Sequence, residues 1–93
     1  MDGIYKLKVH GGKLVIVKIG YSDRIERIQI LGDFFIHPEE SLGLIEASLI
    51  GLPARSTREK LSGAVREVAE MEGIEMIGIT PDAIAEAALL AMA

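Results

Sequence analysis

The first third of the chain alternates hydrophobic and polar residues at the two-residue period of β-strands. In the first segment, Lys6 and Lys8 alternate with apolar side chains. Two further apolar segments follow. Turn-forming residues at His10-Gly11-Gly12 precede the second segment, and Ser22-Asp23 stands between the second and the third. The pattern predicts three strands, connected in order as an antiparallel meander, over residues 5–9, 14–19 and 24–31.

The middle predicted strand is apolar on both faces, apart from Lys18. Its two faces carry Leu14 and Ile16 on one side and Val15, Val17 and Ile19 on the other. Helices are expected to cover only one of these faces. Two interpretations of the other face stay open: long neighbours such as Lys6, Lys8 and Arg27 shield it, or it docks against a partner.

After the third strand, the hydrophobic period changes to that of α-helices. A proline at the first helical position and acids in the first turn indicate a helix that begins at His37-Pro38-Glu39-Glu40 and ends near Ile50. A second helix follows a capping box formed by Ser56 and Glu59, and it ends at Gly73.

Thr80-Pro81 begins a third and last helix. A run of strands followed by a run of helices is typical of α+β proteins. With 93 residues the chain has material for one hydrophobic core. We therefore expect a single α+β domain over residues 1–93, in which a three-stranded antiparallel sheet is followed by about three helices packed on one face.

Composition and charge exclude several classes of protein. The net charge is -4 and the ten Lys and Arg are scattered from Lys6 to Arg66, which disfavours nucleic-acid binding. The chain has no Cys, as expected for a reducing compartment. The charged amino terminus is no signal peptide, and the Ala-rich residues 83–93 are fewer than the ~20 that span a bilayer. We expect a cytoplasmic protein with no nucleic-acid or membrane partner.

No cluster of residues has the spacing of a catalytic or metal site. His10 and His37 are the only histidines, and their spacing does not place two ligands on one helix face. His37 is best explained as a helix cap, although it could instead form an acid–base pair with Glu40. The glycines match neither of the common phosphate-binding patterns.

Three further polar residues have structural explanations. Ser56 is interpreted as a helix cap. Asp23 and Asp33 stand at strand ends, where aspartate commonly bonds its own turn, although the two could instead pair as carboxylates around a metal. We expect no catalytic and no metal-ligating residue in this chain.

The junction between sheet and helices carries the unusual sequence Gly32-Asp33-Phe34-Phe35, which holds both phenylalanines of the chain. Adjacent residues of an extended segment point to opposite sides, so one ring is expected to enter the core and the other to face outward as a partner contact. Gly32 is expected to let the chain turn, and Asp33 to tie that turn.

The stretch from Lys8 to Leu52 resembles the C-terminal accessory domain of lipoate–protein ligases. The resemblance rests above all on Gly11-Gly12-Lys13, on residues 25–31 and on Gly32-Asp33-Phe34-Phe35. The later helices and the Gly-Ile-Thr-Pro turn at residues 78–81 continue the pattern, so that the resemblance covers nearly the whole chain.

In this family a large domain binds lipoate and ATP, makes lipoyl-AMP and transfers the lipoyl group to a lysine of acceptor lipoyl domains, while the small domain assists activation. The sequence contains none of the large domain's catalytic motifs and begins at its own Met1. The resemblance therefore implies a non-catalytic accessory subunit, in a heterodimer with a separate catalytic subunit. It implies no cofactor bound by this chain alone, and ATP, Mg and lipoate bound in the complex.

The main alternative is a free-standing binding or scaffold module, in one version a homodimer, with no relation to lipoate. An iron–sulfur scaffold has a loosely similar order of strands and helices, but the absence of Cys argues against cluster ligation. A small independent enzyme is the weakest alternative, because no acid, base or nucleophile is clustered with another.

Overall fold

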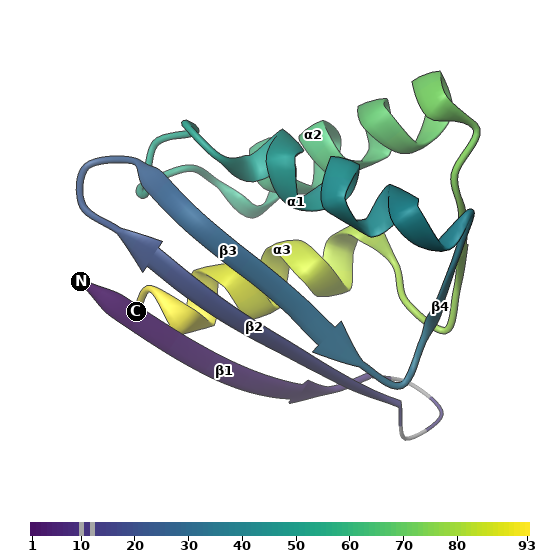
Figure 1. The fold of residues 1–93 in the computed structure, drawn as a ribbon. Coiled ribbons are helices and arrows are strands. Elements are labelled where there is room, and N and C mark those ends of the chain that lie inside the picture. The colour runs from purple at the N-terminus through teal and green to yellow at the C-terminus, as the bar shows by residue number, and fades with distance from the viewer. Residues whose placement is uncertain (10, 12) are drawn as a thin grey trace.

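Three antiparallel strands form the main sheet, and three helices lie on one of its faces (Figure 1). The computed structural model describes residues 1–9, 11 and 13–93. The strands lie across the sheet in chain order, which confirms the predicted meander and the α+β fold. Their bounds are Asp2–Lys8 for β1, Leu14–Tyr21 for β2 and Ile25–Gly32 for β3. The turn expected at His10-Gly11-Gly12 lies partly outside the described residues.

The helices form two tiers. Helix α1 (Leu42–Leu49) packs against β3, and α3 (Pro81–Ala91) packs against β1 and β2. Helix α2 (Arg58–Glu72) packs against both of the other helices (Figure 1). Among the described residues, no helix combines the length and the apolarity that crossing a bilayer requires.

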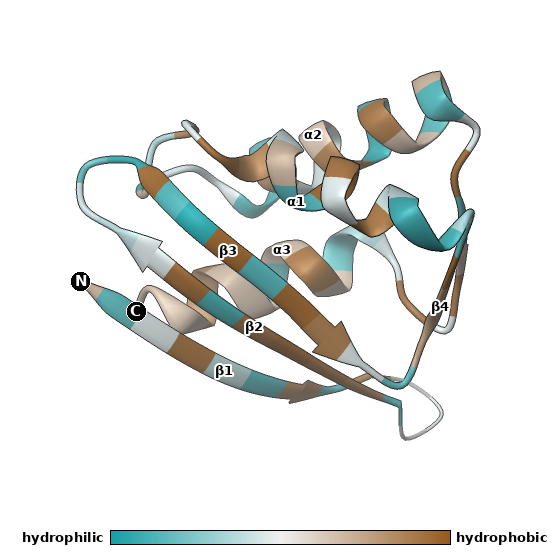
Figure 2. Ribbon diagram, in the orientation of Figure 1, coloured by the Kyte–Doolittle hydropathy of each residue, from teal (hydrophilic) through white to brown (hydrophobic). Residues whose placement is uncertain are grey.

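The core lies between the sheet and the helices. Alternate residues of the strands, such as Val15, Val17 and Ile30, are fully buried, and Figure 2 shows the alternation of apolar and polar residues along β3. Helix α3 contributes mainly alanines to the core, and a Cβ at Gly3 would overlap the carbonyl oxygen of Ala91. Small residues on both elements therefore allow α3 to lie close to β1.

The two ends of the chain lie side by side at one end of the sheet (Figure 1). The amino group of Met1 donates to the carbonyl oxygen of Tyr21 at 2.8 Å, and the Tyr21 hydroxyl donates to the carbonyl oxygen of Met92 at 3.2 Å. These bonds connect the start of β1, the end of β2 and the end of α3.

A second, smaller sheet is absent from the sequence-based expectations. Strand β4 (Phe35–His37) pairs antiparallel with β5 (Glu75–Ile77). The two segments are far apart in the sequence, so no local pattern reveals their pairing. His37 ends a strand, and the expectation that it caps a helix is wrong.

The first helix also begins later than expected. Residues Glu39–Ser41 form a 3₁₀ turn, η1, and the α-helix starts at Leu42. Pro38 precedes the 3₁₀ turn as its N-cap residue and is not the first residue of an α-helix. Pairing of β4 with β5 keeps residues 35–37 extended, which moves the helix start toward the carboxyl terminus.

The cap of α2 differs from the expected one by one residue. The Thr57 hydroxyl accepts the backbone N–H of Lys60 at 3.1 Å, whereas Ser56 donates to the carbonyl oxygen of Pro53 at 2.6 Å. The capping box predicted at Ser56 is therefore wrong. The predicted end of α2 at Gly73 (φ +63°) is confirmed, as is the start of α3 at Thr80-Pro81.

We predict that Thr57→Ala lowers the free energy of unfolding by about 1 kcal/mol, because the first turn of α2 loses the acceptor for an otherwise unpaired N–H. Thr57→Asn retains an acceptor and should stay within a few tenths of a kcal/mol of the wild-type chain. Urea unfolding followed by circular dichroism measures both changes. Equal stability of the Ala and Asn variants would contradict this assignment of the cap.

Candidate functional site

The motif Gly32-Asp33-Phe34-Phe35 lies where the chain leaves the main sheet for β4 (Figure 1). Gly32 has a φ of +147°, and a Cβ there would overlap the carbonyl oxygen of Leu14 on the neighbouring strand. The Asp33 backbone N–H donates to that same oxygen at 2.9 Å. Only glycine allows this close crossing and this backbone conformation. The hydrogen bond that holds this turn is therefore made by the backbone of Asp33.

The two rings of the motif have different surroundings. Phe34 is partly buried and packs against the core, whereas Phe35 is 71% exposed. The predicted division between one inward and one outward ring is confirmed. Phe35 pairs with Ile77 across the small sheet, and Ile77 is 49% exposed. Directly paired residues lie on the same face of a sheet. We call this exposed apolar pair the Phe35–Ile77 patch.

Segments that are distant in the sequence meet at this end of the main sheet. A shallow hollow is lined by Gly11, Lys13 and the four residues of the Gly32–Phe35 motif. Gly78 (φ +83°) lies against Asp33 and Phe34. The hairpin end, the aromatic motif and the turn at residues 78–81 therefore adjoin one another, and these are the segments that carried the resemblance in the sequence.

The described residues hold no metal-binding cluster of three or more His, Cys, Asp or Glu side chains. Asp23 and Asp33 stand beyond opposite ends of β3, whose eight residues span roughly 25 Å at ~3.3 Å per residue, so the interpretation of the two as a carboxylate pair is wrong. Neither of the two ion pairs in the described residues includes His37 or Glu40.

One carboxylate has a perturbed pKa for a structural reason. The buried Ser62 hydroxyl on α2 donates to Asp82 Oδ1 at 2.5 Å, and this bond lowers the pKa of Asp82 below its ordinary value of 3.8. Desolvation, the second-largest effect, raises this pKa, and the Arg66 and Arg58 cations each lower it by a smaller amount. Asp82 stands in the first turn of α3, so the bond joins α2 to α3.

The second candidate surface is the face of the main sheet that no helix covers (Figure 1). We call it the outer sheet face. It carries Asp2, Ile4, Lys6, Lys8, Leu14, Ile16, Lys18, Arg27, Gln29 and Leu31. Ile16 is half-buried between its paired neighbours Lys6 and Leu31. Long neighbouring side chains therefore shield part of the apolar outer surface of the middle strand, β2. Ile4 remains 55% exposed.

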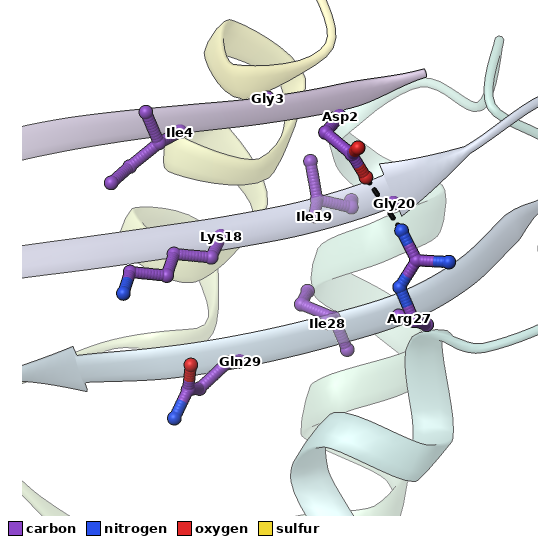
Figure 3. A pocket seen from close by; sticks show the side chains of 9 residues that line it. All are labelled: Asp2, Gly3, Ile4, Lys18, Ile19, Gly20, Arg27, Ile28 and Gln29. Atoms are coloured by element: carbon purple, nitrogen blue, oxygen red, sulfur yellow. Dashed lines mark hydrogen bonds and ion pairs between the residues drawn. The ribbon is translucent and has the colours of Figure 1, made fainter.

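An ion pair crosses one end of the outer sheet face, as Figure 3 shows. Arg27 Nη2 on β3 donates to Asp2 Oδ1 on β1 at 2.5 Å, passing over Gly20 on β2. A Cβ at Gly20 would overlap the guanidinium. Beside this pair lies a shallow hollow whose lining includes Ile4, Lys18 and Gln29.

Comparisons with known proteins give one informative match. No family model matches the chain, and no curated protein matches it either. Among solved structures, the chain is similar to one from Thermoplasma acidophilum, described as an archaeal lipoylation system with a bi-partite lipoate protein ligase and its E2 lipoyl domain. The identity is 28%, the similarity covers 95% of this chain and 97% of that chain, and the TM-score is 0.71. The chain thus shares its fold with a component of a lipoylation system.

We predict that Asp82→Asn destabilises the fold at neutral pH and that this difference disappears in acid. A carboxylate whose folded pKa is depressed adds stability above its unfolded pKa, and that stability is lost as the pH falls through the folded pKa. The lowered pKa of Asp82 places this loss below about pH 3.8. Unfolding by urea at several pH values measures it. Glu86→Gln, an equal change of charge at an exposed position of α3, is the control, and identical pH profiles of the two variants would contradict the prediction.

Proposed function

We propose that this chain is the accessory subunit of a bipartite lipoate–protein ligase. In this role it associates with a separate catalytic subunit and is needed for the ATP-dependent activation of lipoate to lipoyl-AMP. The observation that carries the proposal is the similarity to a component of an archaeal bi-partite ligase system over 95% of this chain and 97% of the other. Nearly every part of each chain therefore has a counterpart in the other.

The accessory role is preferred to that of the E2 lipoyl domain because of particular residues. Gly32-Asp33-Phe34-Phe35 and the turn at residues 78–81 resemble the accessory domain of the ligase family. In the fold, these two segments adjoin each other and leave Phe35 exposed. The chain has lysines of its own, so lipoylation of one of them is the result that would favour the role of a lipoyl domain.

An accessory subunit can assist a reaction without supplying a reacting group. By covering a neighbouring active site it excludes water and fixes the relative positions of ATP and lipoate, which lowers the barrier to adenylation. ATP, Mg and lipoate would then bind in the heterodimer, and the acceptor lipoyl domains would meet the complex.

The Phe35–Ile77 patch is the contact we assign to the catalytic subunit. Full burial of a phenylalanine side chain contributes about 2 kcal/mol relative to exposure. Phe35 is 71% exposed in the free chain, so most of that contribution is available for association. Gly32 and Phe34 act indirectly in this interface, because they fix the direction in which β4 leaves the sheet.

The experiment that tests the function is reconstitution with the catalytic subunit of the same bipartite ligase. We expect lipoyl-AMP formation, measured by pyrophosphate release, to rise when this chain is added. An unchanged adenylation rate would contradict the proposal. Mass spectrometry of this chain after the reaction should show no lipoyl group, whereas a lipoylated lysine would identify the chain as an acceptor.

Replacing Phe34 by alanine should mainly affect stability, whereas replacing Phe35 should mainly affect binding to the catalytic subunit. Phe34→Ala should lower the free energy of unfolding by about 2 kcal/mol, because it leaves a cavity beside the core. Phe35→Ala should change stability by less than about 0.5 kcal/mol and weaken binding to the catalytic subunit by roughly tenfold. Titration calorimetry and urea unfolding separate these effects.

A matched control for Phe35 is Met71, an apolar residue of α2 that is 73% exposed and outside the patch. Met71→Ala should leave binding to the catalytic subunit unchanged. If Phe35→Ala and Met71→Ala bind equally well, or if both phenylalanine variants merely unfold, the assignment of the contact fails.

A further inference from the structure

One edge of the main sheet is open. Met1 and Tyr21 exchange two backbone bonds of 2.8 Å, and the Val9 N–H donates to the carbonyl oxygen of Lys13, also at 2.8 Å. Hydrogen-bonded pairs alternate along antiparallel strands, so the odd-numbered residues of β1 bond to β2. The backbone groups that point away from β2 belong to Asp2, Ile4, Lys6 and Lys8. No other described element lies beyond β1 (Figure 1).

The opposite edge of the sheet is occupied by the chain itself. Glu46 on α1 accepts the Ile30 N–H through Oε2 at 2.8 Å. At the start of β3, Ile25 donates to the carbonyl oxygen of Leu52 at 2.9 Å and accepts the Gly51 N–H at 2.8 Å. The fold therefore blocks strand addition at β3 and leaves β1 as the edge that can pair with another strand.

The outer sheet face beside this open edge is basic, although the protein as a whole is acidic. The net charge of the chain is -4. The face carries four cations, Lys6, Lys8, Lys18 and Arg27, and one acid, Asp2, which Arg27 already pairs. Neither ion pair of the described residues includes a lysine. Three lysines are thus available to anionic groups at alternate positions of an added strand.

The surface suits a protein strand better than a nucleic acid. Its exposed apolar residues are aliphatic, Ile4 and Leu31, and the sheet's two tyrosines, Tyr5 and Tyr21, belong to the opposite face. Nucleic-acid sites of this size commonly use aromatic side chains on which bases stack. Outward backbone N–H and C=O groups, in contrast, are matched by a polypeptide strand.

We propose that β1 accepts an extended, acidic segment of a partner protein as a fourth strand of the main sheet. The segment pairs through its backbone with the outward groups of Ile4, Lys6 and Lys8, and its acidic side chains lie at alternate positions on the outer sheet face. Directly opposed side chains of neighbouring strands are in contact distance, so each acid meets a lysine or lies beside Ile4. The inference does not depend on the ligase role, because the edge and its charges belong to this chain.

A second copy of this chain is a poorer occupant of the edge. Pairing of β1 with β1 would join two outer sheet faces, each with a net charge of +3 from four cations and one acid, into a single basic surface. Lysines on an edge strand commonly prevent such self-association. The same lysines favour a partner of opposite charge.

The test uses the full chain and two synthetic ten-residue peptides that differ only in charge. One alternates glutamate with valine, and the other alternates lysine with valine. Nuclear magnetic resonance follows the exchange of individual amide hydrogens. We expect the glutamate peptide to slow exchange at Ile4, Lys6 and Lys8 and to bind on the order of tenfold more tightly than the lysine peptide.

A charge-reversal variant sharpens this test. Lys6→Glu/Lys8→Glu should reverse the preference between the two peptides, while Arg55→Glu/Lys60→Glu, an equal change of charge at exposed positions outside the sheet, should leave it unchanged. Circular dichroism verifies that both variants are folded. The comparison of peptides on the unaltered chain stands even if a variant fails to fold.

Four results of the binding and exchange experiments would overturn the proposal. They are equal binding of the two peptides, no binding of the glutamate peptide at millimolar concentration, protection of amides outside β1, and stronger protection of β1 by an oligonucleotide than by the glutamate peptide. Sedimentation as a dimer whose β1 amides are already protected would likewise assign the edge to a second copy of the chain.

Discussion

The close packing of α3 on the first two strands is the constraint on which the rest of the structure depends. The carboxyl-terminal helix crosses β1 where Gly3 has no side chain, and its buried surface consists largely of alanines. Because the helix lies so near the sheet, Val15 and Val17 are completely buried beneath it. Helix α3, from the far end of the sequence, thus completes the core by burying one face of β2. The other face of the same strand is left toward solvent.

The turn at Gly32 has a comparable effect on the other side of the molecule. Since Gly32 crosses directly over the Leu14 carbonyl, the chain leaves the main sheet at a fixed angle and pairs again as β4. Two adjacent phenylalanines then have different environments, with Phe34 against the core and Phe35 in solvent. A backbone requirement at one glycine thus determines which aromatic ring is available to a partner.

Local sequence patterns are sufficient for the elements that local physics determines. The alternation along β1 to β3, the glycine end of α2 and the Thr80-Pro81 start of α3 follow from strand period and capping chemistry within a few residues. The opposite exposure of Phe34 and Phe35 follows from their adjacency alone.

The features that the sequence analysis missed depend on contacts between distant segments. His37 is held in a strand by Glu75, and Thr57 caps α2 because Ser56 is occupied by Pro53. The two sheet edges differ because Glu46 and Gly51 bond to the outward backbone groups of β3 and no described residue does so at β1. No sequence pattern marks Glu46 or Gly51 for this role. Lys6 and Lys8 were visible as polar strand positions, but their place on an open edge appears only in the assembled sheet.

The side-by-side termini have a geometric consequence for how this unit can be attached to another protein. Both ends lie at the opposite end of the main sheet from β4 (Figure 1). A covalent tether at either end would therefore be attached roughly 25 Å from the Phe35–Ile77 patch, which is about the length of β3. A tether and the proposed contact at the Phe35–Ile77 patch would then lie at opposite ends of the domain, so a linker that spans the sheet would leave the same proposed contact open in a linked unit and in a free one.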